Sequence, residues 1–345
     1  MGFVSGDALH WPGGEAKGSM IMDNLDLPTI DYGRFGATTI DVRIMRDATA
    51  VLIGTGGGRL VAELLARSAI GTLIFIDPDA VDGTRNPLTQ GHNWAEHGQP
   101  KVVVAARACR EINPDVRTIP LSVAWNKACD ENCELIASAD ILIACTDSYA
   151  VNRSVRRFGL ARSIDVVEGW IYPNGDACEH VATFREVVNA GGGCGTCHLW
   201  MRHRAYQEGF KNPKDIPTYA IPSAYSSVQT AQLVISRLHQ RAGSQLPIVG
   251  LAAQFQSRPA QITRLNPNFW AGANEPFGDV PAEYATFMTR AFDKDWPADW
   301  QCPDCGDLPK HAASERFELP VDRRFADCAG DAEQRTSTPN KESRT

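Results

Sequence analysis

The chain has 345 residues, 43% of them hydrophobic and 22% charged, which is enough for one large α/β domain or two small ones with a buried core. Its formal net charge of −7, with no basic run to offset it, argues against a nucleic-acid partner. No apolar stretch reaches the roughly 20 residues of a membrane span, and residues 1–17 lack the basic start and apolar centre of a signal peptide, so we expect a cytoplasmic protein.

The first half of the chain opens with a pattern that predicts a strand, a tight turn and a helix. Residues 1–24 mix glycine, proline and polar residues without a period, so we expect a loose arm there. A strand is predicted at 50–53 and an amphipathic helix at 61–68, and three glycines lie between them: Gly54, Gly56 and Gly57. Glycine lets the backbone approach a ligand closely, and a helix start presents unpaired N–H groups to an anion. The turn is therefore predicted to bind phosphate.

An acidic residue follows the second predicted strand, 72–76. Asp77 comes 23 residues after Gly54, about where a nucleotide-binding βαβ unit places the acid that binds ribose hydroxyls. Arg59 occupies the position where the dinucleotide pattern has a third glycine. We expect this arginine to crowd the close packing of the helix against the strand.

Further α/β units follow in the same order. A helix is predicted at 102–112, directly after Lys101, and a strand at 116–123. The continuous apolar run 141–145 is typical of a parallel strand buried on both faces. Asp147 comes just after it, at the carboxyl end of a strand, where open α/β sheets place ligand groups. Beyond residue 170 the predicted segments become shorter and antiparallel, apart from a polar loop predicted from His203 to Thr218 and a helix predicted at 227–238.

Ten cysteines need a role other than disulfides in a reducing compartment. Four of them form two CxxC pairs, each flanked by glycine or proline: Cys194 with Cys197, and Cys302 with Cys305. Two such knuckles predict a tetrahedral zinc site with four cysteine ligands. Residues 307–345 are polar with few large apolar side chains, so we expect a disordered tail.

Taken together, these motifs resemble the ThiF/MoeB-like branch of the ubiquitin-activating-enzyme superfamily over roughly residues 25–306. The counterparts stand in the family's order: Gly54-Thr55-Gly56-Gly57, Asp77-Pro78-Asp79-Ala80-Val81, Asn86-Pro87-Leu88-Thr89-Gln90, Gly98-Gln99-Pro100-Lys101, Cys145-Thr146-Asp147-Ser148 and the two CxxC pairs. The resemblance implies a Rossmann-like open sheet, mostly parallel with antiparallel additions in the second half and with helices on both faces. It also implies a crossover segment at about 198–226.

The activity implied by the resemblance is ATP-dependent adenylation of the C-terminal glycine of a ubiquitin-like or sulfur-carrier protein, with release of pyrophosphate. Attack on the α-phosphate needs the triphosphate held by N–H groups and cations, with a metal sharing the developing charge. The glycine turn would hold phosphates, Lys101 would neutralise them, and Asp147 would bind Mg²⁺. The remaining nucleotide contacts are assigned to the residues Asp77, Asp79, Asn86 and Gln90.

The segment Tyr32-Gly33-Arg34 resembles the amino-terminal segment from which such dimers send an arginine into the neighbouring site. This implies a homodimer in which Arg34 is catalytic. Two positions depart from the family motifs: Thr89 aligns with an arginine, and Ser148 with an asparagine. Arg85 or Arg59 could each supply the missing positive charge, and the sequence leaves both open.

No cysteine occurs between His198 and Gln301, where relatives that form a thioester keep their nucleophile. We therefore expect no thioester on this chain. Either the adenylate passes directly to an acceptor, such as a downstream carrier or conjugating protein, or a hydroxyl accepts it; the candidate hydroxyls are Thr218, Ser223, Ser226 and Ser227. Alternative hypotheses are an inactive module that binds a nucleotide or a ubiquitin-like protein and, less favoured, a dinucleotide-dependent oxidoreductase.

Overall fold

The computed structural model describes residues 29–211, 218–266, 286–291, 296–297 and 299–306. Contacts divide the chain into 1–31 and 32–345, and all the described helices and strands belong to the second unit. The predicted arm at 1–24 and the predicted tail at 307–345 lie outside the described residues.

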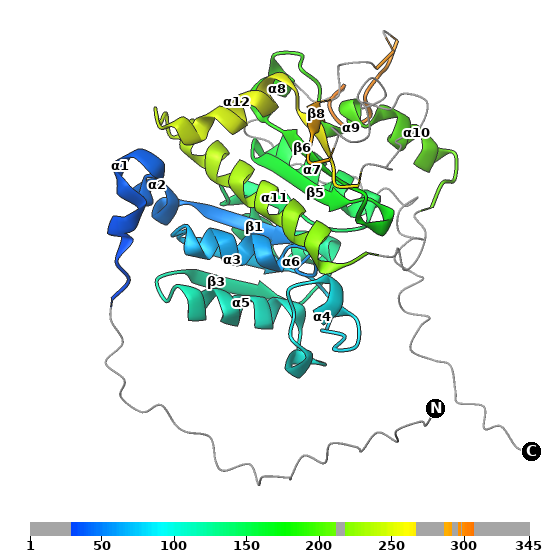
Figure 1. The fold of residues 1–345 in the computed structure, drawn as a ribbon. Helices are drawn as coiled ribbons and strands as arrows, with labels where there is room; N and C mark the ends of the chain where they lie inside the picture. Colours follow the sequence, from blue (N-terminus) through cyan, green and yellow to red (C-terminus); the bar gives the residue numbers. More distant parts are fainter. Residues whose placement is uncertain (1–28, 212–217, 267–285, 292–295, 298, 307–345) are drawn as a thin grey trace, which may run out of the picture. The chain divides into compact units, whose positions relative to one another are not determined.

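Eight strands form one sheet in the order β3-β2-β1-β4-β5-β6-β7-β8 (Figure 1). Neighbouring strands from β3 to β5 pair in parallel, whereas β6, β7 and β8 are added antiparallel. The predicted sheet, mostly parallel with antiparallel additions in the second half, is thereby confirmed. The strands are β1 (Thr49–Ile53), β2 (Thr72–Ile76), β3 (Arg117–Leu121), β4 (Ile141–Ala144), β5 (Asp165–Ile171), β6 (Ala177–Thr183), β7 (Ala260–Arg264) and β8 (Thr289–Ala291).

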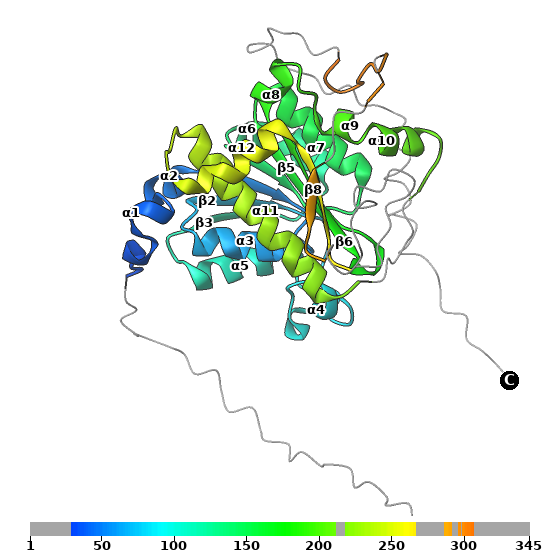
Figure 2. The same cartoon turned by 45° about the horizontal axis from the view of Figure 1, so that its top comes forward.

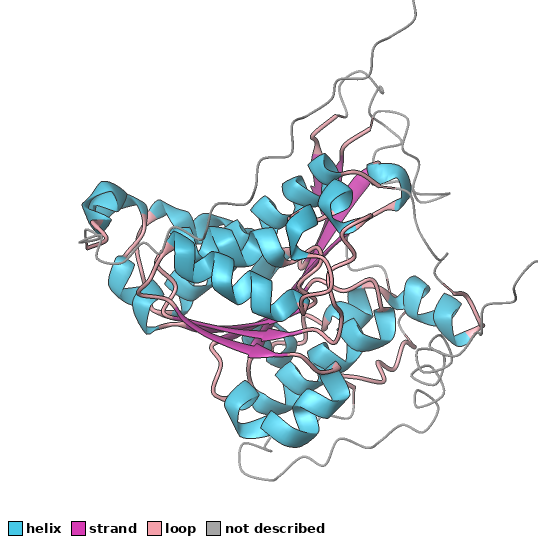
Figure 3. Ribbon diagram, turned by 90° about the horizontal axis from the view of Figure 1, so that it is seen from below, coloured by secondary structure: helices cyan, strands magenta, loops and turns pink. Residues whose placement is uncertain are grey.

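Helices cover both faces of this sheet (Figures 2 and 3). Alternate residues of β1 belong to different hydrophobic clusters, Leu52 to one and Val51 to the other, so the strand is buried on both sides. Burial on both faces is the physical reason why the sequence of such a strand is a continuous apolar run. One face is covered by α3 (Arg59–Arg67), α5 (Lys101–Ile112) and α11 (Ala220–Arg241), and the other by α6 (Trp125–Ala137) and α7 (Tyr149–Arg162).

The shorter helices lie in the connections. They are η1 (Tyr32–Phe35), α1 (Gly36–Thr39), α2 (Val42–Asp47), α4 (Asn86–Thr89), η2 (Trp94–Glu96), η3 (Pro173–Gly175), α8 (Arg185–Asn189), α9 (Gly195–His198), α10 (Trp200–Gln207), η4 (Pro247–Val249) and α12 (Gly250–Ser257). Among the helices that the structure describes, none has the length and apolar character to cross a membrane.

Candidate functional site

The predicted phosphate turn lies at the point where the strand order reverses. It follows β1, and the Thr146–Ser148 loop follows the adjacent strand β4. Gly54 has φ +87°, and a Cβ there would lie 2.7 Å from the carbonyl oxygen of Cys145. Only glycine fits this position, because the turn and the β4 loop approach each other so closely. Open α/β sheets bind ligands in the crevice outside the strand ends at such a switch point.

The glycine that allows α3 to pack closely is Gly58. A Cβ at this position would lie 2.4 Å from the Gly54 carbonyl oxygen and 3.0 Å from a Leu52 methyl group. The expectation that Arg59 would crowd the helix against the strand is therefore wrong. The glycines at 54, 56 and 58 could have indicated this packing from the sequence. The third glycine of the dinucleotide pattern would stand at position 59, and here Gly58 takes its place one position earlier.

The Arg59 side chain points instead into the loop between β2 and α5. Its guanidinium donates to Glu63 Oε1 at 2.9 Å and to Glu96 Oε2 at 2.5 Å, and its Nη1 lies 3.1 Å from His92 Nδ1. The other ring nitrogen of His92 lies 3.2 Å from the Thr55 carbonyl oxygen. Burial, followed by the nearby Arg59 charge, lowers the pKa of His92. This buried cluster fixes the loop against the glycine turn, and it leaves Arg59 engaged in structural ion pairs.

The candidate nucleotide residues Asn86 and Gln90 differ in their surroundings. Asn86 Oδ1 accepts a hydrogen bond from the Asp82 amide at 2.7 Å. Gln90 lies over the turn, where a Cβ on Gly56 would be 2.7 Å from its Oε1. That buried oxygen has no hydrogen-bond partner. Rotating the Gln90 side-chain amide would exchange its oxygen and its N–H₂ group, so the N–H₂ group would face the turn. Gln90 could then donate a hydrogen bond to a phosphate held by the turn.

The two aspartates after β2 have different surroundings. Asp77 is buried, and its carboxylate accepts hydrogen bonds from the Thr55 amide at 2.7 Å, the Thr55 hydroxyl at 3.0 Å and the Asp79 amide at 2.9 Å. Asp77 thus shapes the turn. The Asp79 side chain is 63% exposed and lies 3.0 Å from the ammonium nitrogen of Lys101, the first residue of α5. These two charges form an ion pair just beyond the carboxyl end of β2.

Asp147 is exposed in the loop after β4. The N-cap of α7 is the next residue, Ser148, whose hydroxyl accepts from the Val151 amide. Ser148 therefore supplies the side-chain cap of this helix. The loop is fixed by Asn152, whose side chain bonds both the hydroxyl of Thr146 at 2.6 Å and its carbonyl at 3.1 Å.

The two remaining candidate arginines are exposed. Arg85 Nε lies 2.8 Å from Asp82 Oδ2, and its side chain is 70% exposed on the loop beside the turn. Arg34 lies in η1, next to Tyr32, whose hydroxyl donates to Asn113 at the end of α5. Lys101 begins this helix of 12 residues, so Tyr32 is separated from the lysine end by about 18 Å. The short helix η1, which carries Arg34, thus contacts the end of α5 that is far from Lys101.

The first turns of α11 contact the glycine turn, which the sequence did not indicate. The Ser227 hydroxyl lies 3.1 Å from the Gly57 carbonyl oxygen and 2.8 Å from that of Ser223. Ser226 is also buried, and its carbonyl lies 3.1 Å from His180 Nε2. Because their hydroxyls are buried, Ser226 and Ser227 are poorly placed to accept an adenylated carboxylate.

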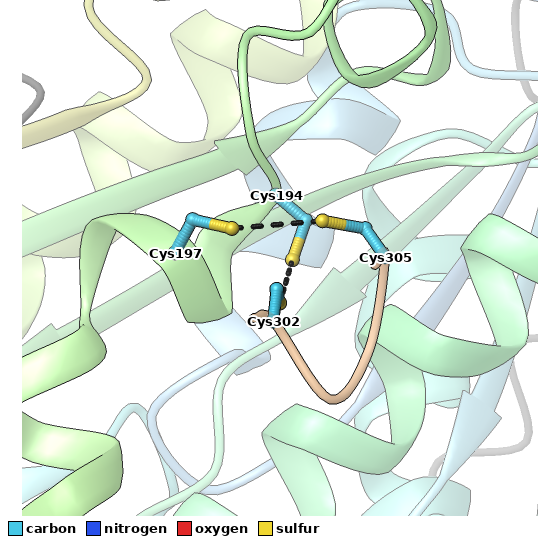
Figure 4. Close-up of side chains that lie close together, drawn as sticks. All are labelled: Cys194, Cys197, Cys302 and Cys305. Carbon is cyan, nitrogen blue, oxygen red and sulfur yellow. Dashed lines mark hydrogen bonds between the residues drawn. The ribbon is translucent and has the colours of Figure 1, made fainter. Parts of the chain in front are cut away.

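The four predicted cysteines converge (Figure 4). Their sulfur atoms all lie within 4.8 Å of one another, with 3.6 Å between Cys194 and Cys302 and 3.5 Å between Cys197 and Cys305. A tetrahedral zinc site with Zn–S bonds of about 2.3 Å has S···S edges of about 3.8 Å. The cluster therefore has the donors and the size to hold one metal ion.

Comparisons with known proteins agree with this arrangement. The model of the ThiF family matches residues 35–256. A molybdopterin-synthase adenylyltransferase of Escherichia coli is 31% identical over 126 residues, which is 36% of this chain and 50% of that protein. A SAMP-activating enzyme E1 of Haloferax volcanii is 28% identical over 123 residues, covering 35% of this chain and 45% of that protein. The chain spans about half the length of these curated relatives.

Solved structures share the fold. The crystal structure of E. coli MccB with ATP superposes with a TM-score of 0.52, 19% sequence identity and coverage of 77% of this chain and 68% of that chain.

Proposed function

Since this chain belongs to the ThiF family, we propose that it uses ATP to adenylate a carboxylate and releases pyrophosphate. The observation that supports the proposal is that the glycine turn, the Asp79–Lys101 ion pair and Asp147 follow the carboxyl ends of three neighbouring strands, β1, β2 and β4. Gly54 shapes the turn against the β4 loop, Lys101 and Asp79 form an ion pair after β2, and Asp147 follows β4. The curated relatives named adenylyltransferase and activating enzyme support the same reaction class.

The residues would share the work as follows. The amides of Gly56 and Gly57 would hold phosphate oxygens, and Gln90 would add its side-chain N–H₂ group. Lys101 would neutralise charge on the phosphates as they separate. Asp79 is the better candidate for the ribose hydroxyls, because the carboxylate of Asp77 already accepts two hydrogen bonds from the turn and one from the Asp79 amide.

Asp147 would hold Mg²⁺, whose preferred ligands are hard carboxylate oxygens. The ion would share the charge that develops on the phosphates. Arg85 would supply the charge that Thr89 lacks, because Arg59 is buried in ion pairs with Glu63 and Glu96. The four cysteines would hold a structural Zn²⁺.

We propose the C-terminal glycine of a ubiquitin-like or sulfur-carrier protein as the substrate carboxylate. The names of the curated relatives support this class. Transfer would go directly from the adenylate to an external acceptor, because no cysteine occurs between His198 and Gln301 and two of the four candidate hydroxyls are buried.

Arg34 would act in a homodimer. Within one chain η1 contacts the end of α5 that is about 18 Å along the helix from Lys101, which favours a role for Arg34 at the glycine turn of a second copy. Mixed dimers of Arg34→Ala and Asp147→Ala chains would test this. Complementation, with one intact site per mixed dimer, supports supply from the partner.

ATP–pyrophosphate exchange tests the proposed function. The purified protein, with zinc content measured, is assayed with Mg²⁺ and candidate proteins that end in glycine. We expect exchange that depends on the added protein and is abolished by Asp147→Ala. Asp130→Ala is the matched control, since Asp130 is an exposed aspartate on α6.

A folded, zinc-loaded protein that binds ATP but shows no exchange with any candidate would instead favour an inactive binding module. The replacement of the family arginine by Thr89, which is half-buried, already points in that direction. Adding Thr89→Arg to the assay separates the two functions, because gained exchange would identify the missing charge as the cause.

A further inference from the structure

The two cysteine knuckles are joined by a pair of polar side chains as well as by their sulfurs. Thr196 lies inside the first CxxC and Asp304 inside the second. The Thr196 hydroxyl donates to Asp304 Oδ2 at 2.6 Å, and the Asp304 side chain is 0% exposed. A four-cysteine metal site does not require a buried carboxylate, so its presence needs a separate explanation.

Asp304 connects the second knuckle to α7. Arg153 Nε lies 2.9 Å from each Asp304 carboxylate oxygen, and Arg153 Nη2 lies 2.6 Å from Oδ1. Burying a carboxylate costs several kcal/mol unless charge and hydrogen bonds offset it, and this geometry provides both. The pair fixes the position of α7 relative to the knuckle.

From Arg153 the contacts continue to the Asp147 loop. Asn152, the neighbour of Arg153 on α7, holds Thr146 by two hydrogen bonds of 2.6 and 3.1 Å. Thr146 directly precedes Asp147, and Ser148 caps the helix directly after it. The backbone of Asp147 is thus held on both sides by the first turn of α7.

A second route starts two residues before the knuckle. The ring of Trp300 packs edge-on against His203 with 6.1 Å between ring centroids. His203 Nδ1 lies 2.8 Å from the hydroxyl of Tyr149, the first residue of α7, and Tyr149 stacks on Tyr206 at 4.4 Å. Both routes end within two residues of Asp147.

We propose that Asp304 is a positioning residue, which sets the Asp147 loop through Arg153 and Asn152. The four-cysteine cluster then serves the nucleotide site as well as local folding. This inference rests on the proposed Mg²⁺ role of Asp147. It predicts that weakening the Asp304 contact loosens the loop and selectively weakens ATP binding that depends on Mg²⁺.

The test uses Asp304→Asn in the full chain and measures three quantities. Zinc content should remain at one equivalent, because all four cysteines are present. Amide hydrogen exchange over 146–152 should speed up at least tenfold. ATP affinity measured with Mg²⁺ should fall about tenfold, whereas ATP affinity measured with excess chelator of Mg²⁺ should be unchanged. A role confined to general stability would not produce this split.

Asp165→Asn is the matched control. Asp165 is another buried carboxylate held by an arginine, Arg237 at 2.8 Å, but it lies at the opposite, amino end of β5. Asp165→Asn should leave the rate of amide hydrogen exchange over 146–152 unchanged. If Asp304→Asn loses zinc, Arg153→Lys is used as the test variant instead. It leaves both CxxC knuckles intact but removes the planar guanidinium that binds the Asp304 carboxylate.

Unchanged exchange over 146–152 in both Asp304→Asn and Arg153→Lys would overturn the inference. So would equal loosening in the Asp165→Asn control. If the wild-type protein does not bind ATP, the proposed function is refuted but the positioning role of Asp304 is not. The comparison of amide hydrogen exchange rates needs no nucleotide.

Discussion

Gly57 and Gly58 are adjacent, yet the structure predicts opposite effects of alanine at the two positions. A Cβ on Gly58 would lie 2.4 Å from the Gly54 oxygen, 3.0 Å from Leu52 Cδ1 and 3.1 Å from Cys145 Cβ. A Cβ on Gly57 would meet nothing closer than 4.0 Å. Gly58 has φ −79°, and Gly57 is not among the residues with positive φ, so neither needs glycine for its conformation.

The cost of Gly58→Ala is therefore steric. The nearest atom is a backbone oxygen, which cannot move aside as a flexible side chain could, and its residue Gly54 is itself packed against the β4 loop. Overpacking of this kind costs about 1–3 kcal/mol, and we expect the upper end of that range. Gly57→Ala should change the free energy of unfolding by about zero to +1 kcal/mol, because alanine restricts the unfolded chain.

Urea unfolding followed by tryptophan fluorescence measures both free energies of unfolding, and Gly58→Ala should also lower Tm by about 4–6 °C. Equal stabilities of the two variants would refute the assignment of Gly58 as the packing glycine. A destabilised Gly57→Ala with a stable Gly58→Ala would show that the turn has a different backbone from the one described.

Three further predictions follow from individual groups. Burial lowers the pKa of His180 to about 4, from an unfolded value of 6.5. The free energy of unfolding should therefore fall as pH drops from 6.5 toward 4, and should be about 2 kcal/mol lower at pH 5. His180→Gln should make the free energy of unfolding, measured with urea, depend less on pH. Cys302→Ser should reduce bound zinc below one equivalent by colorimetric assay and shift tryptophan emission to the red, because Trp296 and Trp300 pack on the cluster. Lys101→Met should weaken ATP binding about 10- to 100-fold by calorimetry, whereas Lys127→Met on α6 should have no effect.

The parallel strands could be predicted because strands buried on both faces have a strong local signal. The predicted strand 50–53 is observed as Thr49–Ile53, and the predicted helix 102–112 as Lys101–Ile112. Each is an apolar run bounded by glycine, proline or polar residues, so its limits are set by neighbours in the sequence. The two CxxC pairs were equally local, and their convergence is confirmed.

Helix boundaries failed where the local signal was misleading. The sequence predicts a polar loop from His203 to Thr218, but α10 spans Trp200–Gln207. α11 was predicted to begin at Ser227 and begins at Ala220. Pro222 is the third residue of this helix, where a backbone N–H would have no partner within the helix, so proline is tolerated there.

The contacts that complete the site could not be predicted, because each joins distant parts of the chain. Arg153 and Asp304 are 151 residues apart, and Ser227 and Gly57 are 170 apart. Serine, aspartate and arginine occur on most protein surfaces, so nothing in the sequence marks these three as buried partners. The role of Asp77 could not be predicted either. Its position in the sequence predicted a contact with a ligand, whereas in the structure its carboxylate accepts a hydrogen bond from the turn itself.

The late position of α11 in the chain affects the order in which a newly made polypeptide folds. α11 packs against α3 and β5, so these elements keep apolar surface exposed until residues 220–241 leave the ribosome. The glycine turn is synthesised early, but the Ser227 hydroxyl that contacts it is made much later. A nascent chain that ends before α11 therefore presents an open sheet face that chaperones would recognise, and truncations in this region should aggregate rather than give a smaller folded domain.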